Sequence, residues 1–173
     1  LNGHIDYISH TDPNGKFHLE KAGKLWQVKK NQHLTEVLTD AAIEQVNNMS
    51  TTPYFMMVSY ANPHAPILLP GEDAIFQGQG KEKNDSPERY QKLVAVLDTE
   101  IGKLVAAIEK KLDNTIIIFI SDQGAPSQLE GNYPYLGGKG NLLEGGIKSP
   151  CILYWPGKLS PQRKQIFCTG LDV

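Results

Sequence analysis

The sequence predicts an α/β fold with a mostly parallel central sheet flanked by helices. Two short apolar runs, residues 54–60 and 115–120, have the composition that is typical of strands buried on both faces. Residues 86–112, which follow a helical period, lie between them. Because a strand, a helix and a strand in this order form a crossover unit, we expect the two strands to pair in parallel, with a right-handed connection.

Length and chain ends predict one incomplete domain that spans residues 1–173. A chain of 173 residues is long enough for about one domain. It begins at Leu1 rather than at a Met and closes at Val173 in what reads as the middle of an element, so we expect a piece of a longer protein. Missing strands would expose sheet edges, and we expect a tendency to self-associate through them.

Charge and cysteine content exclude several classes of protein. The net charge is −2 and the pI is near 6.2, so the composition indicates no surface for nucleic acids. No apolar run approaches the roughly 20 residues that a membrane-spanning helix needs. The two cysteines, Cys151 and Cys168, fit neither a disulfide framework nor a zinc site, and we expect both to be buried thiols.

The first third of the chain is expected to contain loops and one helix. Glycines and prolines interrupt residues 1–30, although residues 24–28 alternate weakly and are a candidate short strand. Residues 35–49 carry an apolar stripe at helical spacing, with Thr35 or Thr39 as the N-cap. Three histidines fit no metal spacing and are expected on the surface or in loop packing: His4, His10 and His18.

The clearest helix covers residues 86–112. Ser86 fits the N-cap position, Pro87 fits the first helical position, and Glu88 complements the positive end of the helix dipole. The apolar stripe of this helix is expected to pack against the sheet. Residues 150–155 predict one more strand, and residues 164–168 are a candidate edge strand.

Polar residues follow both predicted central strands. His64 comes after the first strand and is flanked by Pro63 and Pro66, which stiffen its loop. Asp122 and Gln123 come directly after the second strand. In open α/β sheets, ligands bind beyond the carboxyl ends of the strands. A lone histidine at such a place is more often structural, and Asp122 and Gln123 could equally cap a loop.

The chemistry of these side chains favours an ester of an oxyanion as ligand. Asp122 and Gln123 offer hard oxygen atoms, which suit Ca²⁺ or Mg²⁺. Lys139 lies in the glycine-rich segment 137–140, where a ligand can approach the backbone closely. A solvated lysine in a glycine turn is the simpler reading. A cation site beside an anion-binding lysine would nevertheless suit a sulfate or phosphate ester.

The order of the motifs resembles the second half of the catalytic domain of type I sulfatases, within the alkaline phosphatase superfamily. That family has S-D-N-G after a strand, then G-G-K-G, E-G-G, a short strand and W-P-G. The matching segments of this chain are S-D-Q-G at 121–124, G-G-K-G at 137–140, E-G-G at 144–146 and W-P-G at 155–157. The segment P-H-A-P, residues 63–66, and the segment D-Y-I-S-H, residues 6–10, also resemble family patterns.

The resemblance implies a role for each candidate residue. Asp122 and Gln123 would bind a divalent cation, Ca²⁺ in the first place and Mg²⁺ as the alternative. The family has Asn where this chain has Gln123, whose side chain is one methylene longer, so the resemblance implies a looser or shifted metal site. His64 and Lys139 would contact the sulfate group as catalytic and substrate-binding residues, and Glu144 would stabilise the loop.

The resemblance also implies groups that this chain does not contain. Type I sulfatases use a formylglycine made from Cys or Ser in a C/S-x-P/A-x-R motif, and neither Cys151 nor Cys168 lies in one. We expect that nucleophile in the full-length protein, and we expect the isolated chain to be inactive. The expected partner is a sulfated small molecule or glycan, and the family suggests a periplasmic, secreted or lysosomal location.

The sequence is also compatible with two other functions. One is a phosphodiesterase or phosphonate hydrolase of the same superfamily. The other is a non-catalytic protein that kept the sulfatase fold.

Overall fold

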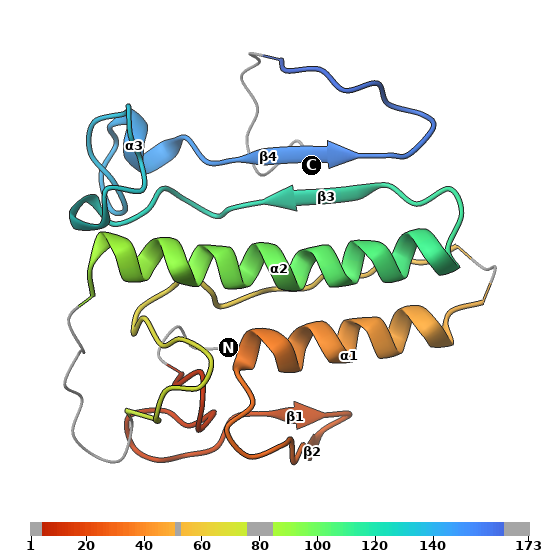
Figure 1. Cartoon of the computed structure of the whole chain (residues 1–173), viewed down its shortest axis with the longest axis horizontal. Coiled ribbons are helices and arrows are strands. Elements are labelled where there is room, and N and C mark those ends of the chain that lie inside the picture. Colours follow the sequence, from red (N-terminus) through yellow and green to blue (C-terminus); the bar gives the residue numbers. More distant parts are fainter. Residues whose placement is uncertain (1–4, 51–52, 76–84, 165–173) are drawn as a thin grey trace. The chain divides into compact units, whose positions relative to one another are not determined.

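The computed structural model describes residues 5–50, 53–75 and 85–164 (Figure 1). The chain divides into two compact units, Leu1–Leu112 and Asp113–Val173. Within the described residues, no helix is both long and apolar enough to cross a membrane. The single-domain organisation expected from the sequence stays a prediction.

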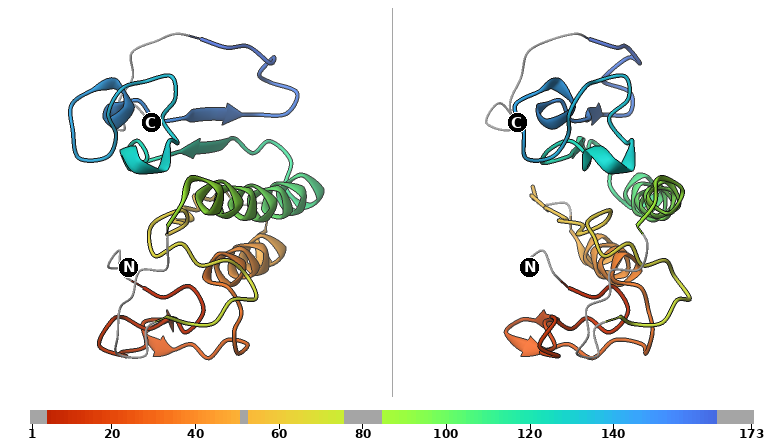
Figure 2. Two further views of the ribbon diagram at one scale, coloured as in Figure 1. Left: turned by 60° about the vertical axis from the view of Figure 1, so that its left-hand side comes forward. Right: turned by 90° about the vertical axis from the view of Figure 1, so that its left-hand side faces the viewer.

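Two helices form the centre of the first unit. Helix α1 covers Leu34–Asn48 and helix α2 covers Pro87–Lys111, and the two pack against each other. They lie side by side and run in the same direction (Figures 1 and 2). The facing apolar side chains are buried: Leu34, Val37, Ala42 and Val46 of α1, and Leu93, Leu97, Leu104 and Ile108 of α2.

Helix α1 begins one residue earlier than the sequence predicts, and its cap is different. The imidazole of His33, rather than Thr35 or Thr39, accepts a hydrogen bond from the backbone N–H of Thr35, at 3.3 Å. Thr35 and Thr39 are instead buried in the core, where the Thr39 hydroxyl donates to the carbonyl oxygen of Thr35 at 2.9 Å. His33 is itself buried, which is unusual for a cap residue.

The helix predicted from residue 86 onward is confirmed and corresponds to α2. Ser86 is the N-cap, its hydroxyl oxygen accepts the N–H of Arg89 at 3.3 Å, and Pro87 opens the first turn. The apolar stripe packs on α1, and its expected packing on a sheet stays a prediction. Glu100 also lies within the buried stripe and pairs with Lys103 one turn on.

Residues 54–60 are not assigned to a strand, contrary to the prediction. They form no strand with any described segment, and several of their side chains are exposed, Phe55 at 90% and Met57 at 76%. An apolar run indicates only that a segment favours burial; a strand also needs a neighbour for its N–H and C=O groups. The only sheet described in this unit is a short antiparallel pair, β1 (Glu20–Lys21) and β2 (Lys24–Leu25).

The second unit is built on a two-stranded antiparallel sheet. Strand β3, Ile117–Ile120, pairs with β4, Cys151–Tyr154, and Ile120 lies opposite Cys151. The parallel sheet expected from the crossover pattern is therefore absent from the described residues, where both sheets are antiparallel. Cys151 is exposed, so the prediction of a buried thiol is wrong at this position.

The loop between β3 and β4 contains two short helical turns. They are η1, Ser127–Leu129, and α3, Glu144–Ile147. The candidate edge strand at 164–168 lies outside the described residues, apart from Lys164, and so does Cys168.

Candidate functional site

His64 lies in a tight turn that several hydrogen bonds fix in place. Its backbone N–H donates to the carbonyl oxygen of Ala61 at 2.9 Å. Its ring Nδ1 lies 2.6 Å from the carbonyl oxygen of Ala65. Because a carbonyl oxygen can only accept, Nδ1 carries the proton, and Nε2 of the neutral ring is then the basic nitrogen.

Tyr7 ties this turn to the start of the described chain. Its hydroxyl lies 2.7 Å from the carbonyl oxygen of His64 and 3.0 Å from that of Ala61, so one O–H serves two acceptors. The ring stacks on His33 with a centroid distance of 5.1 Å. Burial raises the pKa of Tyr7 far above its ordinary value, and nearby Asp85 adds to this rise. Tyr7 is therefore a neutral donor at physiological pH.

Asp6 is fully buried and organises the backbone around Tyr7. Its Oδ1 accepts the N–H groups of Ile8 and Ser9, each at 2.8 Å, and its Oδ2 accepts the N–H of Ile75 at 2.6 Å. His10 is buried too, with Nε2 at 2.9 Å from the carbonyl oxygen of Gln32. His10 is thus buried in loop packing, which is one of the two locations expected for it from the sequence.

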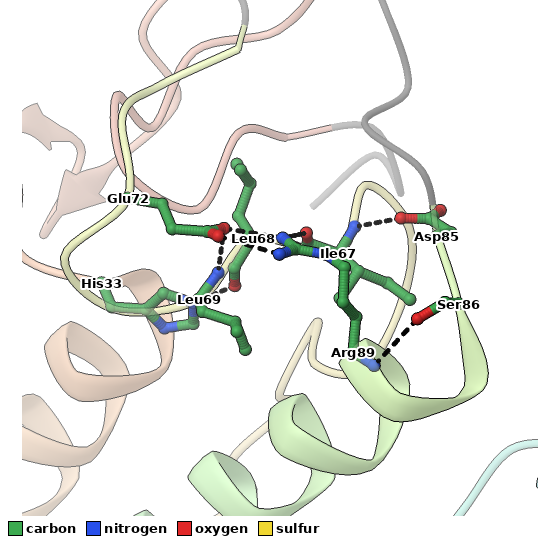
Figure 3. A network of polar contacts seen from close by, with 8 residues as sticks. All are labelled: His33, Ile67, Leu68, Leu69, Glu72, Asp85, Ser86 and Arg89. Carbon is green, nitrogen blue, oxygen red and sulfur yellow. Dashed lines mark hydrogen bonds and ion pairs between the residues drawn. The ribbon is translucent and has the colours of Figure 1, made fainter.

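A second network anchors the chain that follows His64 (Figure 3). The guanidinium of Arg89 in α2 binds both carboxylate oxygens of Glu72, at 2.9 and 2.7 Å, and also donates to the carbonyl oxygen of Ile67 at 2.7 Å. The N–H of Ile67 donates to Asp85 at 3.2 Å. The ring of His33 contacts the carbonyl oxygen of Leu68 at 2.9 Å. The loop after His64 is therefore attached to the N-termini of both helices.

The protonation state of His33 follows from its two contacts. Nε2 donates to the Leu68 carbonyl and Nδ1 accepts from the Thr35 N–H, which only the neutral imidazole can do. Burial lowers the pKa of His33 below its ordinary value. The pKa of His10 is lowered as well, again mainly by burial.

Asp122 and Gln123 lie at the end of β3, as the sequence predicts. Asp122 is exposed, Gln123 is half-buried, and the Gln123 amide nitrogen lies 3.2 Å from Asp122 Oδ2. Ser121 closes the turn by donating to the carbonyl oxygen of Gln123 at 3.0 Å. The Asp122 carboxylate and the Gln123 amide group are thus adjacent, with the amide nitrogen donating to the carboxylate.

These two residues fit part of a site for a hard cation. Ca²⁺ takes about six to eight oxygen ligands, of which Asp122 and Gln123 would supply the carboxylate and one amide oxygen. Within the described ranges, no group of three or more His, Cys, Asp or Glu side chains could hold a metal ion. The remaining ligands would have to come from water, substrate or residues beyond these.

Close backbone contacts join the S-D-Q-G turn to the later glycine motifs. A Cβ on Gly124 would lie 1.7 Å from the carbonyl oxygen of Gly145, so only glycine fits. The N–H of Gly124 donates to the carbonyl oxygen of Gly146 at 3.0 Å. A Cβ on Gly138 would lie 2.5 Å from the carbonyl oxygen of Ala125. The glycines are there to allow backbone-to-backbone packing.

Lys139 lies in the turn that these contacts hold. Its N–H donates to the carbonyl oxygen of Ala125 at 2.9 Å, and its side chain is exposed. Glu144 pairs with Lys148 at 2.9 Å, which agrees with the stabilising role expected for it. Asp122, Gln123 and Lys139 therefore belong to loops that are hydrogen-bonded together within the second unit. His64 belongs to the first unit, and its approach to the other three stays a prediction.

Sequence reasoning missed the residues that support these side chains, namely Asp6, Tyr7, Arg89 and Asn132. Asp6 had a readable signal, since an Asp followed by free backbone N–H groups favours an Asx-type turn. Tyr7 and Arg89 bind segments remote in the sequence, and the Asn132 amide binds the backbone of Ala125 and Gly137 across a loop. Nothing local predicts those partners.

Comparison with known proteins shows which family this chain resembles. The sulfatase family model matches residues 2–172. Arylsulfatase of Hemicentrotus pulcherrimus is 29% identical over 153 residues, covering 85% of this chain and 26% of the relative. N-acetylgalactosamine-6-sulfatase of Homo sapiens is 29% identical over 136 residues, covering 74% of this chain and 24% of the relative.

Solved structures agree with the sequence relatives. The crystal structure of Ps i-CgsB in complex with k-i-k-neocarrahexaose matches with a TM-score of 0.63 and 32% identity, over 80% of this chain and 31% of that one. The chain thus spans about a quarter to a third of the proteins it matches. With the family model covering nearly every residue, the chain belongs to the sulfatase family.

Proposed function

We propose that this chain is part of the catalytic domain of a type I sulfatase, and that the full-length protein hydrolyses sulfate monoesters. One observation carries the proposal beyond family membership. The lysine of G-G-K-G is hydrogen-bonded, through its backbone, to the segment that directly follows S-D-Q-G. A cationic side chain and a pair of oxygen ligands for a cation are thereby held in adjoining loops.

Each side chain then has a chemical task. The Lys139 ammonium would neutralise charge on the sulfate oxygens, and it is exposed to a ligand. His64 would exchange a proton with the leaving oxygen through Nε2, because Nδ1 is engaged with the Ala65 carbonyl. When its imidazole is protonated, Nε2 can donate that proton to the alcohol as the S–O bond breaks.

A divalent cation would be held in part by Asp122 and Gln123, with Ca²⁺ as our proposal and Mg²⁺ as the alternative. When bound, it would supply charge neutralisation at the sulfuryl oxygens. None of the four residues is placed to serve as the nucleophile. The formylglycine expected of type I sulfatases has no matching motif in this sequence.

The substrate class that we propose is a sulfated saccharide. Two of the relatives above support this choice: one is an N-acetylgalactosamine-6-sulfatase, and the other is a structure in complex with k-i-k-neocarrahexaose.

The test is a substrate panel on the full-length gene product. We expect hydrolysis of 4-nitrophenyl sulfate to exceed that of 4-nitrophenyl phosphate and bis(4-nitrophenyl) phosphate. Lys139→Ala should lower kcat/KM for the sulfate ester by about 100-fold, the typical loss when one charge-stabilising group is removed. Lys158→Ala, which alters an exposed lysine outside the motifs, is the control.

A preference for either phosphate ester would replace the sulfatase assignment with the phosphodiesterase alternative. Absence of turnover on all three esters would favour the non-catalytic alternative.

A further inference from the structure

The side chain of Asn132 bridges the two motifs of the second unit. Its Oδ1 accepts the N–H of Ala125 at 2.7 Å. Its Nδ2 donates to the carbonyl oxygen of Ala125 at 2.7 Å and to that of Gly137 at 3.1 Å. One amide therefore satisfies three backbone groups from two segments, one following S-D-Q-G and the other opening G-G-K-G.

Ala125 is the point where these contacts meet. Its carbonyl oxygen accepts both the Asn132 amide and the N–H of Lys139, the latter at 2.9 Å. The position and direction of that carbonyl therefore determine where the backbone of Lys139 lies. Since Asn132 binds the N–H and the C=O of Ala125, it fixes the orientation of this residue on both sides.

The amide is the only side-chain group of this size that matches the pattern. The site needs one acceptor for the Ala125 N–H and two donors for the two carbonyl oxygens, which an Asn amide provides. An aspartate of the same shape would keep the acceptor but lose both donors, and its charge would face two carbonyl oxygens. Asn132 is also half-buried, so water replaces these bonds only in part.

We propose that Asn132 is a positioning residue, which holds the Lys139 backbone in register with the S-D-Q-G turn and so aims the ammonium group at the sulfate. This proposal rests on the proposed function for its chemical meaning. Its structural part, that Asn132 holds Lys139, stands on the hydrogen bonds alone.

The structural part is tested by amide hydrogen exchange on the 173-residue chain. In Asn132→Asp, the Lys139 amide should exchange at least about tenfold faster, because its acceptor is no longer fixed. Asn114→Asp is the matched control, since it makes the same change of charge at an exposed turn residue, with φ of 56°, that aspartate tolerates. Unchanged Lys139 exchange in Asn132→Asp would overturn the proposal, whatever the enzyme does.

The chemical part is tested by a double-mutant cycle in the full-length protein with 4-nitrophenyl sulfate. Asn132→Asp should lower kcat/KM by about 10- to 100-fold, as small displacements of a catalytic group do. If Asn132 acts through Lys139, the same substitution in a Lys139→Ala background should cost less than about threefold. Equal losses in both backgrounds would show a merely structural effect and overturn the positioning role.

Failure of the proposed function and misfolding of the variant give different results. If the wild-type protein hydrolyses no sulfate ester, the proposed function fails, and the exchange result alone decides whether Asn132 holds Lys139. If Asn132→Asp does not fold, as judged by thermal unfolding, Asn132→Ala takes its place. It removes the same two donors without adding charge, and the same criteria apply.

Discussion

The hydroxyl of Tyr7 joins two segments that are distant in the sequence. Removing this hydroxyl tests how much it stabilises the turn that contains His64. Tyr7→Phe keeps the ring that stacks on His33 but leaves the carbonyl oxygens of Ala61 and His64 without this donor. We expect a loss of about 1–3 kcal/mol in the free energy of unfolding, measured with urea. Tyr133→Phe, at a ring that is 91% exposed, should change the stability very little.

His33 predicts a dependence of stability on pH. Its folded pKa is lowered by burial from 6.5, so the unfolded chain binds a proton at a higher pH than the folded chain. Stability is then fully present above about pH 6.5 and falls as the pH drops toward the folded pKa. His10, whose pKa is also lowered, adds to the same trend.

The expected observation is that the urea midpoint of the wild-type chain falls between pH 7.5 and pH 5.5. His33→Asn, which can still cap α1 but does not titrate, should show a smaller fall. A variant with the same pH dependence as the wild-type chain would rule out His33 as a source of acid sensitivity.

At the scale of elements, the loop after His64 depends on one side chain of α2. Arg89 binds Glu72 through two nitrogens and the Ile67 carbonyl through one of them. Lysine cannot reproduce this planar arrangement, so Arg89→Lys should lower the free energy of unfolding by about 1–3 kcal/mol. Arg163→Lys, at an exposed position, provides the control for the same exchange.

Replacing glycine by alanine should have opposite effects on stability at two positions of the chain. Gly124→Ala would place a Cβ 1.7 Å from a backbone oxygen, and we expect it to destabilise the chain by about 1–3 kcal/mol or more. Gly102→Ala, in the exposed middle of α2 with nothing within 4 Å, should stabilise it by up to about 1 kcal/mol. Thermal unfolding of both variants checks the signs, and similar shifts would contradict the packing argument.

Local signals predicted the elements well, and remote contacts explain the failures. Ser86 and Pro87 predicted the start of α2 because a helix N-terminus is satisfied by adjacent residues. The cap of α1 was missed because His33 is held by Leu68, 35 residues away. Residues 54–60 were misjudged because apolar content gives no information on the pairing partner of a strand.

For the whole molecule, the motif order predicted the family, whereas the support of the site could not be predicted. Asp122, Gln123 and Lys139 could be proposed as site residues from their glycine neighbours and from strand ends, and their roles stay predictions. Asn132 resembles any loop asparagine in the sequence, and only the fold shows that its amide meets Ala125 and Gly137.

The isolated chain should bind a divalent cation or a sulfate group but should not hydrolyse a sulfate ester. The four candidate residues offer cation ligands, a cationic side chain and a proton carrier, but no nucleophile. The isolated 173-residue chain should therefore show no hydrolysis of 4-nitrophenyl sulfate above a buffer blank, with the full-length protein as positive control. Sustained turnover by the isolated chain would show that a nucleophile had been overlooked.

The exposed thiol of Cys151 on β4 allows a spectroscopic probe to be attached close to the candidate site. Cys151 lies opposite Ile120, two residues before Asp122 along the neighbouring strand. With Cys168 replaced by serine, a maleimide fluorophore or a nitroxide could be attached there alone. The signal of such a probe would report calcium or sulfate arriving at the turn, without any need for turnover.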